Sequence, residues 1–336
     1  MNKKQIDTIL HSGKFQHAFK DPKLVETHIS YVLLGSSLAY KFKKEIKYSF
    51  LDFSTLQKRK YFCERELVLN NRISTGVYLK VVPVRQQGKD LNIAGTGGKI
   101  IDYALKMKRL KDAKQMHLML DKKRVNKDHI KALAVLIRKF HQQTTVIKNK
   151  FNQQHFATRF NDLLSVKDTI TSSLGAAQAK IIEKAVRVSD KFLQSHYDLF
   201  TQRVEGGFVR DCHGDLHSRN IFLYRKPIIF DCLEFNDEFR QIDILDELAF
   251  FCMDLEADGF YTLSKAFTDH YFSKTKKQFG SREQLLFTYY KCYRANVRAK
   301  VNALRTLQAD DPLRNKRLED VKKYLALMNT YLDELA

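Results

Sequence analysis

The chain has 336 residues, of which 44% are hydrophobic and 12% aromatic, with 13 Gly and 4 Pro, a composition that excludes a disordered or collagen-like protein. Its 59 Lys and Arg residues outnumber 38 Asp and Glu residues, and the formal net charge of +21 suggests nucleic acid, an anionic membrane surface or anionic small molecules as partners. This length allows one large domain or two ordinary ones, each with a sizeable core.

The N-terminal third of the sequence is rich in β-strand patterns. Residues 29–34 and 38–46 predict two strands that a Gly-Ser-Ser turn joins into a hairpin. Residues 55–73, which read TLQKRKYFCERELVLNNRI, are rich in helix formers, and Ser54 or Thr55 can cap their start. We therefore expect a helix that packs on the hairpin.

Two more strands are predicted at residues 77–85 and 99–107, around a turn rich in Gly. The segment GTGGK at residues 95–99 resembles part of a phosphate-binding loop, but the full GxxxxGK[ST] spacing is missing. Ile100 stands where that loop needs Ser or Thr to bind a metal ion. We interpret the segment as a hairpin turn.

From Asp112 onward the pattern is mainly helical, except for a β-and-loop island at residues 208–234. The sequence contains no repeat with a period of 20–50 residues, which argues against a solenoid. The prediction is an α+β protein with a small β-rich N-terminal lobe, residues 1–109, and a larger, mainly helical C-terminal lobe, residues 110–336.

Three polar residues of the island suggest its chemistry. Asp215 is followed five positions later by Asn220, and Asp231 ends the short apolar run PIIFD. Phosphoryl transfer requires a carboxylate that orients the attacking hydroxyl. It also requires hard oxygen ligands for Mg²⁺, which an amide and a second carboxylate can supply. An acidic turn with an Asx cap is the plainer alternative.

The segment HGDLHSRNI…IIFDCLEF resembles the catalytic segment of the aminoglycoside phosphotransferase-like enzymes, which belong to the protein-kinase-like fold and carry HGDxxxxN before a metal-binding Asp. The resemblance implies that Asp215 is the catalytic base and that Asn220 and Asp231 bind Mg²⁺. It also implies that His213 and Gly214 shape the loop. The bilobal kinase-like fold, ATP as phosphate donor and a small-molecule hydroxyl as acceptor follow as expectations.

The resemblance extends upstream. LAYKFKK resembles the strand with the ATP-phosphate lysine, so Lys41 is the expected residue, with Lys43 on the same strand face as the alternative. CERELVLNNRI resembles the helix whose Glu pairs with that Lys, and spacing favours Glu66 over Glu64. ALKMKRL resembles the hinge strand whose backbone binds adenine, around Lys106, Met107 and Lys108.

Much of the chain also resembles a poorly characterised bacterial subgroup, some members of which carry an additional P-loop kinase domain; this chain is expected to act without one. Two departures from the wider family stand out. There is no Gly-rich GxGxxG loop, so the Gly-Ser-Ser turn would cover the phosphates. Relatives usually read Asp-Leu-Ala after the metal-binding Asp, whereas this chain reads Glu247-Leu248-Ala249 after Asp246.

Two charged regions allow alternative interpretations. The segment from Asp231 to Asp258 contains ten acids, both ends included. These acids could face Mg²⁺ or a cationic substrate, or could be acids that favour a helix start. At spacings of three, four and seven, Lys291, Arg294, Arg298 and Arg305 share one helix stripe, which could bind an anionic substrate or be a solvated basic face.

The positive charge is concentrated before residue 150, where 32 basic and 12 acidic residues give +20, while the remaining residues give +1. This distribution favours an anionic nucleotide in the first lobe and argues against a bulky cationic substrate. Five Cys without a CxxC pair suggest a reducing compartment, with Cys212 and Cys232 as packing residues. With no secretory signal or membrane span in the sequence, we expect a cytoplasmic protein that does not bind membranes.

The leading hypothesis is an ATP- and Mg²⁺-dependent kinase of a small-molecule hydroxyl. One alternative is a protein kinase, which the absence of an APE-type segment and activation loop after Asp231 disfavours. Another is a non-catalytic kinase-like module whose basic N-terminal lobe docks a polyanion, although no specific nucleic-acid motif supports it.

Overall fold

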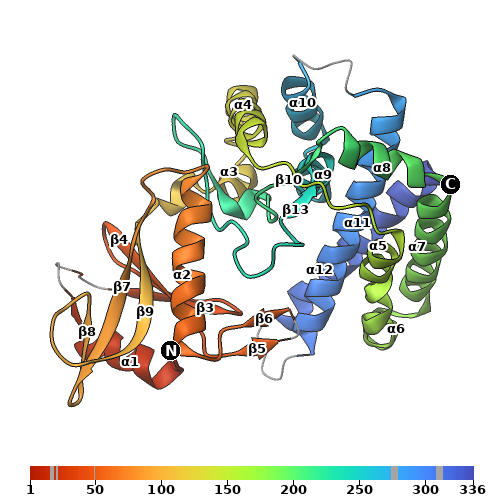
Figure 1. Ribbon diagram of the computed structural model, residues 1–336. Coiled ribbons are helices and arrows are strands. Elements are labelled where there is room, and N and C mark those ends of the chain that lie inside the picture. The colour runs from red at the N-terminus through yellow and green to blue at the C-terminus, as the bar shows by residue number, and fades with distance from the viewer. Residues whose placement is uncertain (16–18, 20–21, 49, 274–278, 308–312) are drawn as a thin grey trace. The chain divides into compact units, whose positions relative to one another are not determined.

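The structure is a computed structural model that divides into two compact units (Figure 1). The first unit comprises Met1–Arg124 and Arg219–Arg240, and the second comprises Val125–Ser218 and Gln241–Ala336. The structure describes all residues except 16–18, 20, 21, 49, 274–278 and 308–312. The division into a nucleotide-binding lobe, residues 1–109, and a substrate-binding lobe, residues 110–336, stays a prediction.

A seven-stranded sheet, in the order β1-β8-β7-β9-β4-β3-β2, forms the centre of the first unit. Its strands are β1 (Lys14–Phe15), β2 (Lys23–Glu26), β3 (Ser30–Leu34), β4 (Leu38–Lys43), β7 (Tyr78–Gln87), β8 (Asp90–Ile93) and β9 (Lys99–Lys108). All neighbours are antiparallel except β1 and β8. The predicted hairpin is confirmed, because β3 and β4 pair from Ser30 with Lys43 to Leu34 with Ala39.

The alternation of β4 places apolar and charged side chains on opposite faces of the sheet. Tyr40 and Phe42 are fully buried in an apolar cluster with Leu33 and the helix α1 (Lys3–Ser12). Lys41 belongs to the other face because successive side chains of a strand point to opposite sides. This face is the one that positions the candidate site.

The helix α2 (Leu56–Asn71) packs mainly against β7 and β9, rather than on the β3–β4 hairpin as predicted. Its start confirms the predicted cap, because Thr55 accepts a hydrogen bond from the Lys58 N–H at 3.2 Å. Glu66 and Asn70, four residues apart and therefore on one face of the helix, are both completely buried. Smaller elements complete this unit: β5 (Lys47–Tyr48), β6 (Leu51–Asp52), η1 (Asp112–Lys114), α3 (Met116–Asp121), β11 (Ile221–Phe222) and β12 (Ile228–Ile229).

The second unit is mainly helical, as predicted. Its helices are α4 (Lys127–Gln143), α5 (Gln153–Asn161), η2 (Asp162–Val166), α6 (Lys167–Leu174), α7 (Ala176–Ser195), α8 (Tyr197–Glu205), α9 (Ile244–Ala257), α10 (Tyr261–Tyr271), α11 (Ser281–Thr306) and α12 (Arg314–Leu335). The short strands β10 (Val209–Asp211) and β13 (Gln241–Asp243) pair antiparallel, and α9 follows β13 directly. Within the described residues, none of the helices combines the length and apolar character that crossing a membrane requires.

Candidate active site

Lys41 lies between two carboxylates in the first unit. Its Nζ is 2.8 Å from Glu66 Oε1 and 2.6 Å from Asp231 Oδ1, and it donates a hydrogen bond to each. Burial opposes the charged form of Lys41, but Asp231 and Glu66 raise its pKa well above the usual lysine value. The structure thus brings together three of the residues that the sequence predicted for nucleotide and metal binding.

The alternative lysine, Lys43, contacts the same glutamate from the same face of β4. Its Nζ is 2.9 Å from Glu66 Oε2 and also forms an ion pair with Glu234. Only 1% of its side chain is exposed, whereas that of Lys41 is 11% exposed. Burial favours the neutral form of Glu66, but Lys41 and Lys43 together lower its pKa. Lys43 therefore holds Glu66 from the buried side and leaves Lys41 as the more accessible cation.

The backbone around Asp231 is fixed by α2 and β7. Asp231 has a φ of 66°, in the left-handed region that is uncommon for a non-Gly residue and frequent at functional sites. Its N–H donates to the Tyr78 hydroxyl at 2.9 Å, and the N–H of Cys232 donates to Asn70 Oδ1 at 3.0 Å. These contacts turn the Asp231 carboxylate toward Lys41 while leaving its side chain 40% exposed.

Asn220 and Asp231 lie at one end of the β11–β12 hairpin. Ile221 pairs with Ile229, and the Phe230 N–H donates to the Asn220 carbonyl at 3.0 Å, so Asn220 lies opposite the residue that precedes Asp231. An amide and a partly exposed carboxylate offer the oxygen ligands that Mg²⁺ prefers. The chemistry of this donor set therefore fits a magnesium ion.

Asp215 belongs to the second unit and lies in the loop after β10. Its Oδ2 is 3.3 Å from His217 Nε2, its N–H donates to His213 Nδ1 at 3.3 Å, and its side chain is 33% exposed. Burial favours its neutral form, but His217 and, more weakly, Arg298 lower the pKa of Asp215. The carboxylate is therefore ionised at neutral pH and can accept a hydrogen bond from a hydroxyl group.

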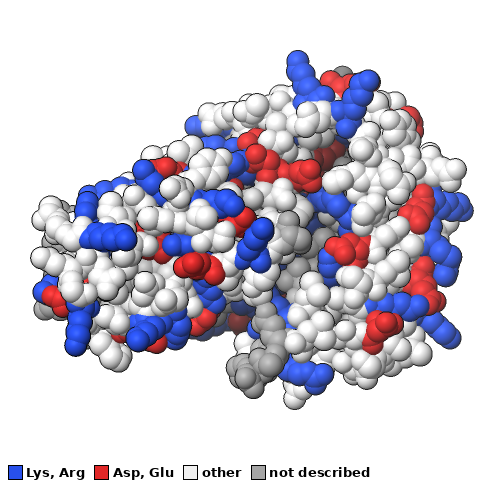
Figure 2. Space-filling model, turned by 60° about the horizontal axis from the view of Figure 1, so that its bottom comes forward, with Lys and Arg blue, Asp and Glu red and all other residues white. Residues whose placement is uncertain are grey.

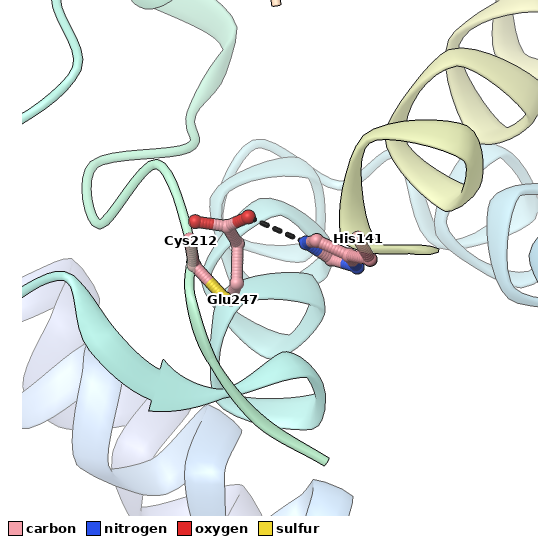
Figure 3. Close-up of side chains that lie close together, drawn as sticks. All are labelled: His141, Cys212 and Glu247. Carbon is pink, nitrogen blue, oxygen red and sulfur yellow. Dashed lines mark hydrogen bonds and ion pairs between the residues drawn. The ribbon is translucent and has the colours of Figure 1, made fainter. Parts of the chain in front are cut away.

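Glu247, whose role the sequence left open, holds the loop that contains Asp215. Its Oε1 accepts hydrogen bonds from the N–H groups of His213 at 2.6 Å and Gly214 at 2.7 Å. Its Oε2 lies 2.6 Å from His141 Nε2 (Figure 3). The other ring nitrogen of His141 is 2.7 Å from the Tyr271 hydroxyl. Burial opposes its ionisation, but His141 lowers the pKa of Glu247. Glu247 is therefore a positioning residue.

Cys212 lies beside these two side chains, and the three ligand atoms are within 4.8 Å of one another (Figure 3). Burial raises the pKa of Cys212 well above the usual thiol value, and its Sγ donates to the Ile242 carbonyl at 3.6 Å. Both oxygens of Glu247 already accept hydrogen bonds from protein groups. We interpret the cluster as structural, because a thiol that remains protonated is a poor metal ligand.

The acids of α9 are bound to protein partners rather than available to a ligand. Asp243 caps the helix by accepting from the Leu245 N–H at 2.8 Å, and it forms a bidentate ion pair with Arg203 at 2.7 Å for both contacts. Asp246 forms another with Arg294, at 2.6 and 2.9 Å. Asp243 is therefore a helix-start acid, as one of the alternatives predicted. The predicted solvated basic face is wrong for Arg294, because Asp246 of α9 covers this part of the basic stripe on α11.

The predicted hinge residues lie at the end of β9, in the middle of the sheet. Lys106 and Met107 pair with both β4 and β7, and the Lys108 N–H donates to the Val77 carbonyl at 2.8 Å. Met107 belongs to an apolar cluster that also includes Ala39 and the partly buried Leu110, Ile228 and Phe230. Adenine binding by the backbone of these residues stays a prediction.

Comparison with known proteins gives sequence relatives without an assigned role. No protein-family model matches the chain. Uncharacterized proteins of Mycobacterium tuberculosis and Mycobacterium bovis are 29% identical over 291 residues, an alignment that covers 84% of this chain and 55% of theirs. The chain thus spans about half the length of the curated relatives it matches.

Solved structures with a similar fold include an aminoglycoside phosphotransferase, a choline kinase and an ethanolamine kinase. A thermostable mutant of aminoglycoside phosphotransferase APH(4)-Ia superposes with a TM-score of 0.54 at 8% identity, over 94% of this chain and 95% of its own. Choline kinase from Cryptosporidium parvum has a TM-score of 0.52 at 10% identity, over 94% of this chain and 90% of its own. An ethanolamine kinase of Plasmodium vivax has a TM-score of 0.51 at 11% identity, over 93% of this chain and 84% of its own. At such low identity these likenesses show the fold alone, and they confirm the predicted α+β, protein-kinase-like fold.

Proposed function

We propose that this chain is an ATP- and Mg²⁺-dependent phosphotransferase that acts on a hydroxyl group of a small molecule. The observation that carries the proposal is the contact of Lys41 with both Glu66 and Asp231. A lysine fixed by a glutamate and placed beside a partly exposed aspartate suits the phosphates of a nucleotide and their metal ion. The fold and the segment from His213 to Asp231 support the same reading.

In this proposal, the first unit binds the nucleotide. The apolar cluster that contains the buried Ala39 and Met107 and the partly buried Leu110, Ile228 and Phe230 would contact the purine base through its partly buried members. Lys41 contacts the phosphates as a point charge, and its ion pair with Glu66 restricts the positions of its Nζ. Only one carboxylate oxygen of Asp231 is bound by Lys41, which leaves the other for a metal ligand role.

Asn220 and Asp231 would hold Mg²⁺, which when bound supplies positive charge to the phosphate oxygens. Both residues are positioned by the backbone: Asn220 through β11 and Asp231 through its hydrogen bond to Tyr78. Fixed oxygen donors lower the reorganisation that binding and transfer require.

Asp215 would orient the acceptor hydroxyl. The hydroxyl oxygen forms a bond to the γ-phosphorus, the bond from that phosphorus to the bridging oxygen of ADP breaks, and the hydroxyl proton passes to Asp215 and then to water. Because the pKa of Asp215 is lowered, it is a weak base, and its contribution is mainly orientation and proton acceptance late in the transfer. Glu247 keeps the loop in place through the His213 and Gly214 N–H groups.

The proposal is tested by measuring ADP release when the full chain is given ATP, Mg²⁺ and a panel of hydroxyl compounds. We expect at least one compound to raise ADP release well above the rate in its absence, with its phosphate ester detected by mass spectrometry. ADP release that no compound stimulates, or that continues when Mg²⁺ is chelated, would contradict the proposal.

A further inference from the structure

Three basic side chains on α11, at spacings of three and four residues, face the same side of the helix: Lys291, Arg294 and Arg298. Acidic side chains of α9 form ion pairs with two of these three residues. Lys291 Nζ is 3.0 Å from Glu256 Oε2, and Arg294 holds Asp246 through two hydrogen bonds.

Arg298 differs from the other two. No described residue offers it a carboxylate within ion-pair distance, and its Nε is buried without a hydrogen-bond partner. Its guanidinium group lies 5.4 Å from the ring centroid of Tyr324 on α12. Burial opposes its charged form, but Tyr324, which also accepts a side-chain hydrogen bond from it, Asp254 and Asp215 raise the pKa of Arg298. A guanidinium group has five N–H donors, so Arg298 retains capacity to bind.

The surroundings of Arg298 connect it to the loop that contains Asp215. Asp254 accepts a hydrogen bond from the Ser218 N–H at 2.8 Å, three residues after Asp215 in the chain. His217 contacts Asp215 itself. Arg298 therefore lies within electrostatic reach of the group that would receive the acceptor hydroxyl.

We propose that Arg298 binds an anionic group of the substrate, a carboxylate or a phosphate, next to the hydroxyl that Asp215 orients. The inference rests on the proposed phosphotransferase function and specifies its substrate class, an anionic hydroxy compound such as a hydroxy acid or a sugar phosphate. A planar guanidinium group matches the oxygens of either anion in a bidentate manner.

The charges of the second unit favour an anion over a cation at this place. Asp246, Glu247 and Glu256 are all bound by protein groups. Asp254 and Asp215 stabilise the charge of Arg298 without a direct ion pair to it among the described residues. An anion would supply that ion pair, whereas a cation would be repelled by Arg298. This distinguishes the chain from an enzyme whose substrate is a polycation.

The experiment uses the full chain saturated with Mg²⁺ and ADP, and a panel of matched hydroxyl compounds. Each neutral or cationic compound is paired with its carboxylate or phosphate analogue, and binding is measured by ligand-observed NMR titration. We expect the anionic members to bind about tenfold or more tightly than their partners. We expect Arg298→Gln to remove that preference. Arg282→Gln, which changes an exposed residue of α11 that pairs with Asp198, should retain it.

Several results would overturn the inference. They are equal binding of neutral or cationic members, an anion preference that survives in Arg298→Gln, or no binding of any anionic member at about 10 mM, where a site of millimolar Kd is filled. If Arg298→Gln does not fold, Arg298→Lys is measured instead. A reduced preference then supports the inference, and an unchanged preference contradicts it.

Failure of the inference and failure of the proposed function are distinguishable. If the wild-type chain does not bind Mg²⁺ and ADP, the phosphotransferase function itself fails. If the nucleotide binds and the panel shows no preference for anions, only the substrate class is wrong.

Discussion

Each compact unit contains a cluster of buried charge, and the two clusters differ in what they leave available. In the first unit, Asp231 contacts Lys41 through one oxygen and its side chain is 40% exposed. In the second unit, Asp246 and Glu247 are almost completely buried, and both oxygens of each are bound by protein groups. A carboxylate with spare, accessible capacity suits a ligand, whereas one whose oxygens are all bound suits the fold.

The distribution of charge on the surface does not distinguish the two clusters. Basic and acidic side chains are interspersed on the face shown in Figure 2. The net charge of +21 is concentrated in the N-terminal part of the sequence, yet Lys41 and Lys43 within it are buried in ion pairs. The partners and exposure of each charged group therefore say more about function than the total charge does.

The largest effect is expected at Asp215. Asp215→Asn removes the proposed proton acceptor but keeps the size of the side chain, so we expect kcat for the proposed phosphoryl transfer to fall by about a thousandfold. The melting temperature should change little, because the side chain is partly exposed. Steady-state kinetics measure the first and calorimetry the second, with Asp269→Asn on the surface of α10 as a control. A variant that keeps most of its kcat would show that Asp215 has no part in transfer.

The next effect is on stability. Glu247→Ala leaves the His213 and Gly214 N–H groups and His141 without their acceptor, so we expect the free energy of unfolding to fall by about 3 kcal/mol. Urea denaturation measures it, with the exposed Glu205→Ala as a control. If both variants are equally stable, the contrast between the two clusters is wrong.

Lys41→Ala tests the first cluster. Under the proposed function Lys41 contacts phosphate, so its loss should weaken the binding of ATP with Mg²⁺ by roughly tenfold to a hundredfold. Lys47→Ala, at an exposed position of β5, should leave the affinity unchanged. Equal affinities of the two variants, measured by calorimetric titration, would assign the phosphate contact to another residue.

A smaller effect concerns pH. The pKa of Asp215 is lowered, so its carboxylate stays ionised from about pH 8 to about pH 5, and protonation of this group should not reduce kcat in that range. His217→Gln removes the neighbour that lowers the pKa most, so the loss of activity in acid should begin at a higher pH. An unchanged pH–rate profile, with His11→Gln as a control, would show that His217 does not tune Asp215.

The smallest effect addresses the alternative of a polyanion-docking module. Lys47 and Lys58 are both exposed, and Lys58 pairs with Asp52 at 2.5 Å. If the chain is a phosphotransferase of small molecules, replacing both with Gln should change its affinity for single-stranded DNA by less than about twofold. A reduced slope of log Kd against log salt concentration would instead revive the docking hypothesis.

Much of the fold could be predicted from local patterns. Alternation in residues 38–43 indicated β4 and the shared face of Lys41 and Lys43, and the helical pattern after Thr55 indicated α2. Short strands such as β1, β2 and β8 were missed, because two to four residues give too little alternation to detect. The pairing of β1 with β8 also joins distant segments.

The residues of the candidate site could be predicted only where they belong to a sequence motif or to a segment that resembles the family. Lys41, Glu66 and Asp231 were expected to act together and are in contact. The role of Glu247 could not be predicted, because its partner His141 is 106 residues earlier and a buried histidine carries no local signal. The replacement of Asp by Glu in the Asp-Leu-Ala pattern was the one available indication.

The central claim is that the first cluster binds a nucleotide together with Mg²⁺. It is tested most directly by calorimetric titration of ATP into the wild-type chain and Asp231→Asn, each with and without Mg²⁺. We predict that the wild-type chain binds ATP more tightly when Mg²⁺ is present and that Asp231→Asn loses this dependence. Absence of ATP binding under both conditions, or an equal Mg²⁺ dependence in the two proteins, would contradict the account.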